Sequence, residues 1–261
     1  MEPLTTLETV LRRDRAVVAT GLVGMAALGW AYLLYLARGM GGMGMSADMA
    51  MPRMQTWGVV DLGMLFVMWA VMMVAMMVPS ASPVILIVAA ANRKHRERAD
   101  PLVPTGLFLA GYLLVWTAFS AVATVAQWGL HTTALLSPGM VSVSPVLGGL
   151  LLLIAGIFQF TPLKQACLSH CRSPLGFVMG HWRAGRVGAM RMGLEHGLYC
   201  AGCCWILMAL LFVAGVMNLL WVAVISLFVL AEKVLPRGEL VGRLGGAVLL
   251  GAGVVVLASA V

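Results

Sequence analysis

Long apolar segments constrain this chain more than any other feature of its sequence. Of its 261 residues, 61% are hydrophobic and only 10% are charged, whereas soluble domains are about a quarter charged. A transmembrane helix needs roughly 20 consecutive apolar residues, and the chain contains several runs of about that length. The sequence therefore predicts an all-α protein, a polytopic helical bundle that forms a single integral membrane domain over residues 1–261.

The apolar runs predict about seven transmembrane helices. Their approximate limits are 16–37, 58–82, 105–128, 145–161, 191–216, 218–235 and 241–260. The last run is the weakest, and its loss would leave six spans. The second run contains two prolines, Pro79 and Pro83. Each removes a backbone donor and clashes with the preceding turn, so we expect a kink or a break there.

The basic residues predict how the chain is oriented. Of the 17 lysines and arginines, 15 lie at the N-terminus or in the segments 92–104, 162–191 and 233–243, which all fall on one side of the predicted topology. The positive-inside rule then places the N-terminus of this multi-pass chain in the cytoplasm and the C-terminus outside. The placement of the basic residues in alternate loops explains the net charge of +7. We therefore expect the lipid bilayer as a partner and no nucleic acid.

The cysteines are confined to one window, which ends in a ligand-rich helix. All five lie between Cys167 and Cys204. At 100° per residue, His196, Cys200 and Cys203 fall within about a 60° arc, and Cys204 lies just beside it. Thiolate and imidazole together suit Cu(I) or Zn(II). This density favours a functional site over the alternative, in which the cysteines pack as small apolar residues.

A second cluster, Cys167, His170 and Cys171, lies in the basic segment 162–190, which is predicted to be a cytoplasmic loop. If this segment is helical, Cys167 and Cys171 share a face. A metal or redox site and a set of reduced, unliganded thiols explain the cluster equally well. The sequence leaves open whether it forms one site with the cluster around Cys200.

Methionine is a further soft donor that the sequence concentrates. Twelve of the 20 methionines lie between Met40 and Met77. The predicted outer loop 38–57 is rich in methionine and glycine, and the second apolar run carries a stripe at i+4 spacing: Met64, Met68, Met72 and Met76. Thioethers favour Cu(I) and need no deprotonation. The alternatives are a flexible linker and methionines that fill helix interfaces.

Few ionisable residues fall within the predicted spans. Asp61 begins the second span, where it could complement the helix dipole or supply an oxygen ligand above Met64. Glu232 and Lys233 end the sixth span. They are functional candidates, although snorkelling to the inner surface explains them equally well. His181 is expected to be an ordinary interfacial histidine.

These motifs resemble a bacterial family of predicted metal-binding integral membrane proteins, a domain of unknown function. The resemblance covers roughly residues 58–260 and is carried by the segments 69–79, 162–167, 171–174, 196–205 and 231–233. It implies a membrane protein that binds metal, without a settled reaction, metal or substrate.

The leading hypothesis is a multi-pass protein of the bacterial cytoplasmic (inner) membrane that handles or transports a soft metal, most readily Cu(I) and alternatively zinc, through its Met and Cys/His ligands. A periplasmic metal donor or a membrane partner subunit would be its partner. One alternative is a membrane redox enzyme, either a metal-dependent oxidase or a thiol–disulfide oxidoreductase that uses Cys200 and Cys203. Another is a structural or accessory subunit. No catalytic residue is assigned.

Overall fold

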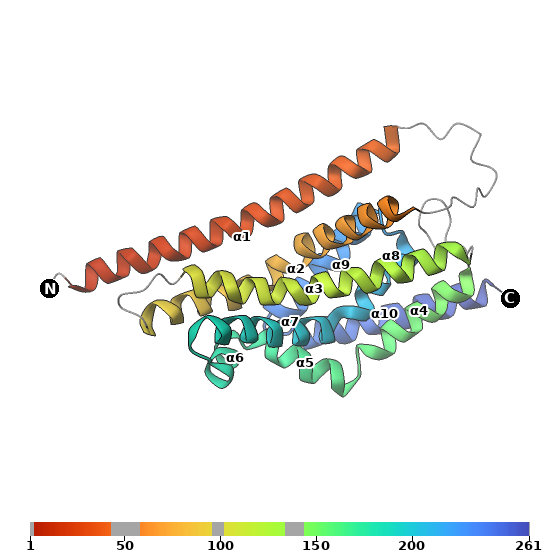
Figure 1. The fold of residues 1–261 in the computed structure, drawn as a ribbon. Helices are drawn as coiled ribbons and strands as arrows, with labels where there is room; N and C mark the ends of the chain where they lie inside the picture. The colour runs from red at the N-terminus through yellow and green to blue at the C-terminus, as the bar shows by residue number, and fades with distance from the viewer. Residues whose placement is uncertain (1–2, 43–57, 96–101, 134–143, 261) are drawn as a thin grey trace.

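The computed structural model describes residues 3–42, 58–95, 102–133 and 144–260. This part of the chain is almost entirely helical and contains no strand, which confirms the all-α prediction. Its helices run roughly alongside one another, and α1 lies along the outside of the bundle against α2 (Figure 1). The helices are α1 (Pro3–Gly42), α2 (Val59–His95), α3 (Leu102–Thr132), α4 (Pro145–Phe158), α5 (Pro162–Arg172), α6 (Pro174–His181), α7 (Gly185–Ala209), α8 (Leu211–Ala214), α9 (Leu219–Val234) and α10 (Gly238–Ala258).

Five helical segments in the described part are long and apolar enough to cross a membrane, and the bent pair of α4 and α5 would make six. The five are Arg15–Arg38, Val59–Arg93, Pro104–Thr132, Gly185–Ala214 and Gly238–Ala258. The predicted span 218–235 corresponds to α9, which has 16 residues. It therefore rises only about 24 Å, against a hydrocarbon core of roughly 30 Å. Seven spans are thus not confirmed.

The segment 162–190, predicted to be a loop, is mostly helical. Prolines open its two short helices, at the position where a missing backbone N–H costs least. The hydroxyl of Thr161 caps α5 by accepting a hydrogen bond from the backbone N–H of Lys164 at 3.3 Å. The chain bends by 65° between α4 and α5. This bend directs α5 against α7, where the two helices pack together.

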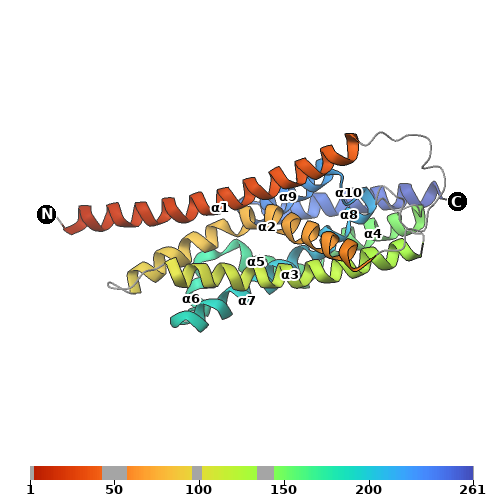
Figure 2. The same cartoon turned by 45° about the horizontal axis from the view of Figure 1, so that its top comes forward.

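Helix α2 continues through Pro79 and Pro83, so the expected break does not occur. Its course nevertheless changes direction midway, in agreement with the expected kink (Figure 2). Beside the prolines, Ser80 and Ser82 donate hydrogen bonds of 2.9 Å to backbone carbonyls of the preceding turn. Hydroxyls of this kind compensate for irregular helix geometry inside an apolar environment.

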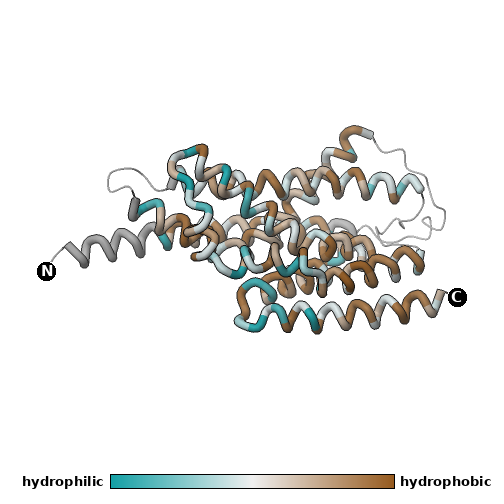
Figure 3. Tube along the Cα trace, turned by 90° about the horizontal axis from the view of Figure 1, so that it is seen from below, coloured by the Kyte–Doolittle hydropathy of each residue, from teal (hydrophilic) through white to brown (hydrophobic). Residues whose placement is uncertain are grey.

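Exposed apolar side chains cover the outer helices, as a lipid-facing surface requires. Hydrophobic residues dominate the half of the bundle that holds the C-terminus, and hydrophilic residues are more frequent toward the other end (Figure 3). In α1 and in α10, only 17% of the most apolar 18-residue stretch of each helix is buried inside the bundle. Several long apolar helices with such surfaces are compatible with a membrane protein.

Helices α4 and α10 approach closely through glycines, as small residues allow in membrane bundles. A Cβ atom at Gly156 would lie 2.9 Å from the carbonyl oxygen of Gly246 and 2.7 Å from the side chain of Leu250. Gly251 lies on α10, the other helix of this pair, and a Cβ there would meet nothing within 4 Å. The two glycines of this helix pair therefore have different roles.

We expect Gly156→Ala to lower the free energy of unfolding by about 1–3 kcal/mol, because the added methyl overpacks this interface. Gly251→Ala is the matched control and should leave stability unchanged or slightly raised, since alanine is the better helix former. Thermal melting of both variants in the same detergent checks this. Equal melting temperatures would contradict the close packing of α4 on α10.

Candidate metal centre

The two cysteine clusters of the sequence meet where α5 packs on α7. Cys171 of α5 lies beside Cys200 and Cys203 of α7, and Cys204 lies beside the same two residues. All four are buried and none forms a disulfide. We call these residues the thiol cluster. The structure thus joins side chains that the sequence left as either one site or two.

Helical periodicity turns the α7 thiols toward one backbone carbonyl. Cys203 and Cys204 follow Cys200 by three and four residues, so they lie on the same face of α7. Their thiols donate hydrogen bonds of 3.1 and 2.9 Å to the carbonyl oxygen of Cys200. Within the described residues, no three His, Cys, Asp or Glu side chains are disposed so that they could hold a metal ion as they stand. A metal held by three or more of these side chains therefore requires some of them to rotate.

Two polar side chains from other helices reach the sulfur of Cys200. The Nζ atom of Lys233 donates to it at 2.9 Å, and the hydroxyl of Tyr112 lies 3.1 Å from it. Lys233 also donates to the hydroxyl of Ser80, and Tyr112 to the carbonyl of Met77, both at 3.2 Å. These contacts join α2, α3, α7 and α9 around one sulfur atom.

A fully buried ion pair lies next to this group. Lys164 of α5 donates to Glu232 of α9 at 2.6 Å, and both side chains are at most 2% exposed. Lys164 also donates to the side-chain oxygen of Gln159. Glu232 and the buried Lys233 therefore turn into the bundle, and the snorkelling explanation is wrong. Sequence reasoning missed Lys164 as a partner, although a lysine so near an apolar run was a signal.

His196 lies one turn before Cys200 on α7 and is 2% exposed. Its ring stacks on Tyr112 at a centroid distance of 5.7 Å and contacts Phe177 at 4.9 Å. Its Nδ1 atom has no hydrogen-bond partner among the described residues. Buried polar atoms without partners are uncommon. The nitrogen is thus a candidate ligand beside the thiol cluster.

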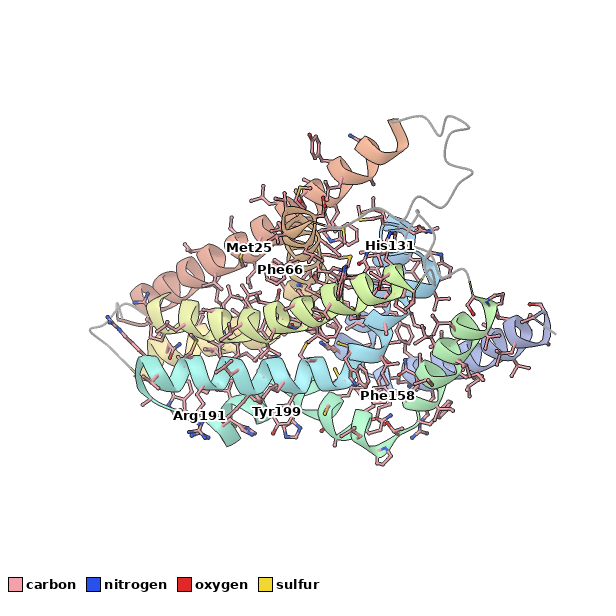
Figure 4. All side chains as sticks on the ribbon, turned by 45° about the vertical axis from the view of Figure 1, so that its right-hand side comes forward. Met25, Phe66, His131, Phe158, Arg191 and Tyr199 are labelled. Carbon is pink, nitrogen blue, oxygen red and sulfur yellow. The ribbon has the colours of Figure 1, made fainter. Side chains whose placement is uncertain are left out.

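The other residues of the second predicted cluster do not enter the thiol cluster. Cys167 lies against Gly202 of α7, where an added Cβ would be 2.8 Å from its sulfur. His170 stacks on Tyr199 of α7 with centroids 4.1 Å apart. Figure 4 shows Tyr199 on the side of α7 that faces α5 and α6. Of the predicted group, Cys171 hydrogen-bonds with Cys200 and Cys203, whereas Cys167 interacts with Cys203 through its charge without a hydrogen bond.

The methionine stripe of α2 is partly buried in the core. Met68, Met72 and Met76 are at most 6% exposed, whereas Met64 is 62% exposed. Met64 therefore does not continue the buried stripe. The stripe ends near the thiol cluster, because the hydroxyl of Tyr112 contacts both the carbonyl of Met77 and the sulfur of Cys200.

Asp61 acts at the start of α2. Its carboxylate accepts a hydrogen bond of 2.9 Å from the backbone N–H of Gly58. This contact agrees with the helix-terminus role that the sequence suggested for Asp61. Most of the methionine-rich segment 38–57 lies outside the described residues, which omit 43–57.

Comparison with known proteins identifies the family. A family model described as PpoB2, copper chaperone, matches residues 66–256, well over half of the chain. The chain belongs to the PpoB2 family. No curated protein and no solved structure matches it. The PpoB2 match contains the thiol cluster, Lys233 and the buried methionines, and leaves α1 outside. It supports a copper-related function, which is more specific than the general metal binding that the resemblance implied.

The ion pair beside the PpoB2 thiol cluster can be tested by unbalancing its charge. Lys164→Met should lower the free energy of unfolding by about 3–5 kcal/mol, because it leaves Glu232 buried without its cation. The double variant Lys164→Met/Glu232→Met removes both charges and should recover most of this loss. Denaturation of the three proteins in one detergent checks the expectation. A double variant as unstable as the single one would contradict it.

Proposed function

We propose that the chain binds Cu(I) as cargo in the thiol cluster and exchanges it within the membrane domain. The observation that carries this proposal is the meeting of four free, buried thiols from α5 and α7 within the part of the chain that matches a copper chaperone family. Soft thiolates suit Cu(I), zinc and iron–sulfur clusters, and the match to a copper chaperone family favours Cu(I) among these. The cysteine positions are therefore those of a cargo site.

The charge beside the thiol cluster favours Cu(I) over zinc. Structural zinc sites are closed tetrahedra of four protein ligands, and no three His, Cys, Asp or Glu side chains of the described residues are arranged, as they stand, to hold a metal ion. Either metal therefore requires thiol side chains to rotate, and zinc requires more of them to do so. Cu(I) can be held by a pair of thiolates, which requires two cysteines to rotate away from the carbonyl of Cys200. Lys233, 2.9 Å from the sulfur of Cys200, would offset the negative charge of such a complex.

The buried methionines supply neutral soft donors along α2. Met76 and Met77 lie beside the helix segments that surround the thiol cluster, since the carbonyl of Met76 accepts a hydrogen bond from Ser226 of α9 and that of Met77 from Tyr112 of α3. Met72 and Met68 precede Met76 by one and two turns of α2. We propose that Cu(I) passes between these thioethers and the thiols by exchange of one ligand at a time.

We further propose a cytoplasmic N-terminus, a bacterial inner-membrane location and a short additional span formed by α9, the sixth in chain order, which brings the total to seven. The distribution of 15 of the 17 basic residues supports this orientation. In this topology the segment 38–57 faces the periplasm, where its methionines would capture copper from a periplasmic donor. The C-terminus would also lie outside.

A topology reporter at the C-terminus tests the number of spans. Seven spans place the C-terminus outside the cytoplasm, so a fused alkaline phosphatase should be active and a fused green fluorescent protein should stay dark. The same reporters fused after residue 95 should give the opposite pattern, since this loop carries four basic residues. A fluorescent C-terminal fusion would require an even number of spans.

Copper binding tests the cargo site. The protein is purified without oxygen in detergent, and Cu(I) is titrated in competition with a chromophoric chelator. Cys200→Ser and Cys203→Ser should each lower the affinity by at least about tenfold, equal to 1.4 kcal/mol or more. Cys167→Ser is the matched control, because this thiol lies outside the cluster, and it should bind as the parent does.

Equal copper binding by the parent and by the Cys200 and Cys203 variants would overturn the cargo site. Tight zinc binding without copper would redirect it to zinc. If the reduced protein binds no metal and Cys200 and Cys203 form a disulfide on oxidation, the alternative of a thiol–disulfide oxidoreductase is favoured instead.

A further inference from the structure

Two histidines outside the thiol cluster meet at a partly exposed edge of the bundle. His170 lies in the last turn of α5, and His181 is the last residue of α6. Their ring centroids are 5.8 Å apart and their planes make an angle of 74°. Metal–nitrogen bonds of about 2.0–2.1 Å place the centroids of two imidazoles on one metal ion roughly 5–6 Å apart. The observed spacing falls within the range of two imidazoles that share one ion.

The same backbone contact orients both rings. Nδ1 of His170 lies 2.8 Å from the carbonyl oxygen of Ala166, and Nδ1 of His181 lies 3.2 Å from that of Phe177. A carbonyl oxygen can only accept, so each Nδ1 carries the hydrogen and Nε2 of the neutral ring keeps its lone pair. Histidines that bind metals almost always donate their second ring N–H to an acceptor of this kind.

Aromatic stacking holds the two rings in place. His170 stacks on Tyr199 with an interplanar angle of 6°, and His181 stacks on Phe177 with centroids 4.8 Å apart. Phe177 and Tyr199 also contact each other edge to face. A ligand pair that is already ordered loses little conformational entropy when it binds an ion. Packing alone explains the stacking, but phenylalanines at both positions would serve packing equally well.

We infer that His170 and His181 form an open, two-histidine copper site at the surface of the bundle. Imidazole suits copper. The coordination positions that the two histidines leave open are available to solvent or to the ligands of a copper donor or acceptor. The site extends the proposed copper handling. Tyr199, which supports His170, precedes Cys200 in the chain, and Phe177, which supports His181, contacts the buried His196 at 4.9 Å. The aromatic residues that support the two histidines therefore adjoin Cys200 in the chain and His196 in space.

The test uses the full chain with all five cysteines replaced by serine, so that it is independent of the thiol cluster. Cu(II) sulfate is added in detergent, and electron paramagnetic resonance reports nitrogen ligands while a chelator competition reports affinity. The parent of this series should show nitrogen coupling. His170→Phe and His181→Phe keep an aromatic ring, yet each should weaken binding at least about tenfold, since even changes beyond the ligand shell cost 10–100-fold.

His131→Phe is the matched control, because Figure 4 shows His131 toward the far end of α3 from Tyr199. It should bind Cu(II) as its parent does. Unchanged spectra and affinity in both ligand variants, or an equal loss in the control, would overturn the inference. If the Cys200 and Cys203 variants bind Cu(I) as the parent does, while the cysteine-free protein still shows nitrogen coupling that depends on both histidines, the proposed cargo site is rejected and this inference stands.

A second measurement covers the case in which the cysteine-free protein does not fold. The intact, reduced chain is loaded with Cu(I) beyond the capacity of its thiols and treated with diethyl pyrocarbonate, which modifies free imidazole nitrogen. Mass spectrometry should show His170 and His181 protected together over the same range of added copper. Modification of either residue at its metal-free rate would overturn the shared site.

Discussion

The packing of charged side chains inside an apolar bundle determines the arrangement of its centre. A buried charge without a partner is costly, and it is far more costly inside a membrane domain than at a surface. Lys164 and Glu232 satisfy each other across α5 and α9. Lys233 has no carboxylate partner among the described residues and instead donates to Cys200 and Ser80. The contact between Lys233 and Cys200 therefore connects the charge of α9 to the cysteines of α7.

This pairing depends on the bend between α4 and α5. Gln159 ends α4 and accepts a hydrogen bond from Lys164, and Thr161 caps the helix that follows. The bend of 65° then carries α5 against α7, which brings Cys171 beside Cys200 and Cys203. A straight continuation of α4 would leave α7 with three thiols and Glu232 without its cation. The buried ion pair and the fourth thiol are thus consequences of one turn in the chain.

The sequence predicted well that the thiols of α7 lie on one face, because they share one helix. The 100° rotation per residue places Cys200, Cys203 and Cys204 on one side without any knowledge of tertiary contacts. Contacts between helices were harder to predict from the sequence. Nothing in the local pattern tells which of Cys167, His170 and Cys171 faces α7, or that Met64 faces outward while Met68, Met72 and Met76 are buried. The interpretation of Lys233 failed for the same reason, because its partner lies 33 residues away on another helix.

The charge of Lys233 also bears on which metal the proposed cargo site would accept. Two thiolates and one Cu(I) ion carry a net charge of −1, which the ammonium of Lys233 brings to zero. Two thiolates and one Zn(II) ion are already neutral, so the same ammonium would remain buried without compensation at a cost of several kcal/mol. A third thiolate would restore neutrality for zinc, but a third cysteine would then have to turn toward the ion, whereas Cu(I) needs only two. Because a low-dielectric interior strengthens every such charge term, the lysine beside Cys200 favours a monovalent cargo.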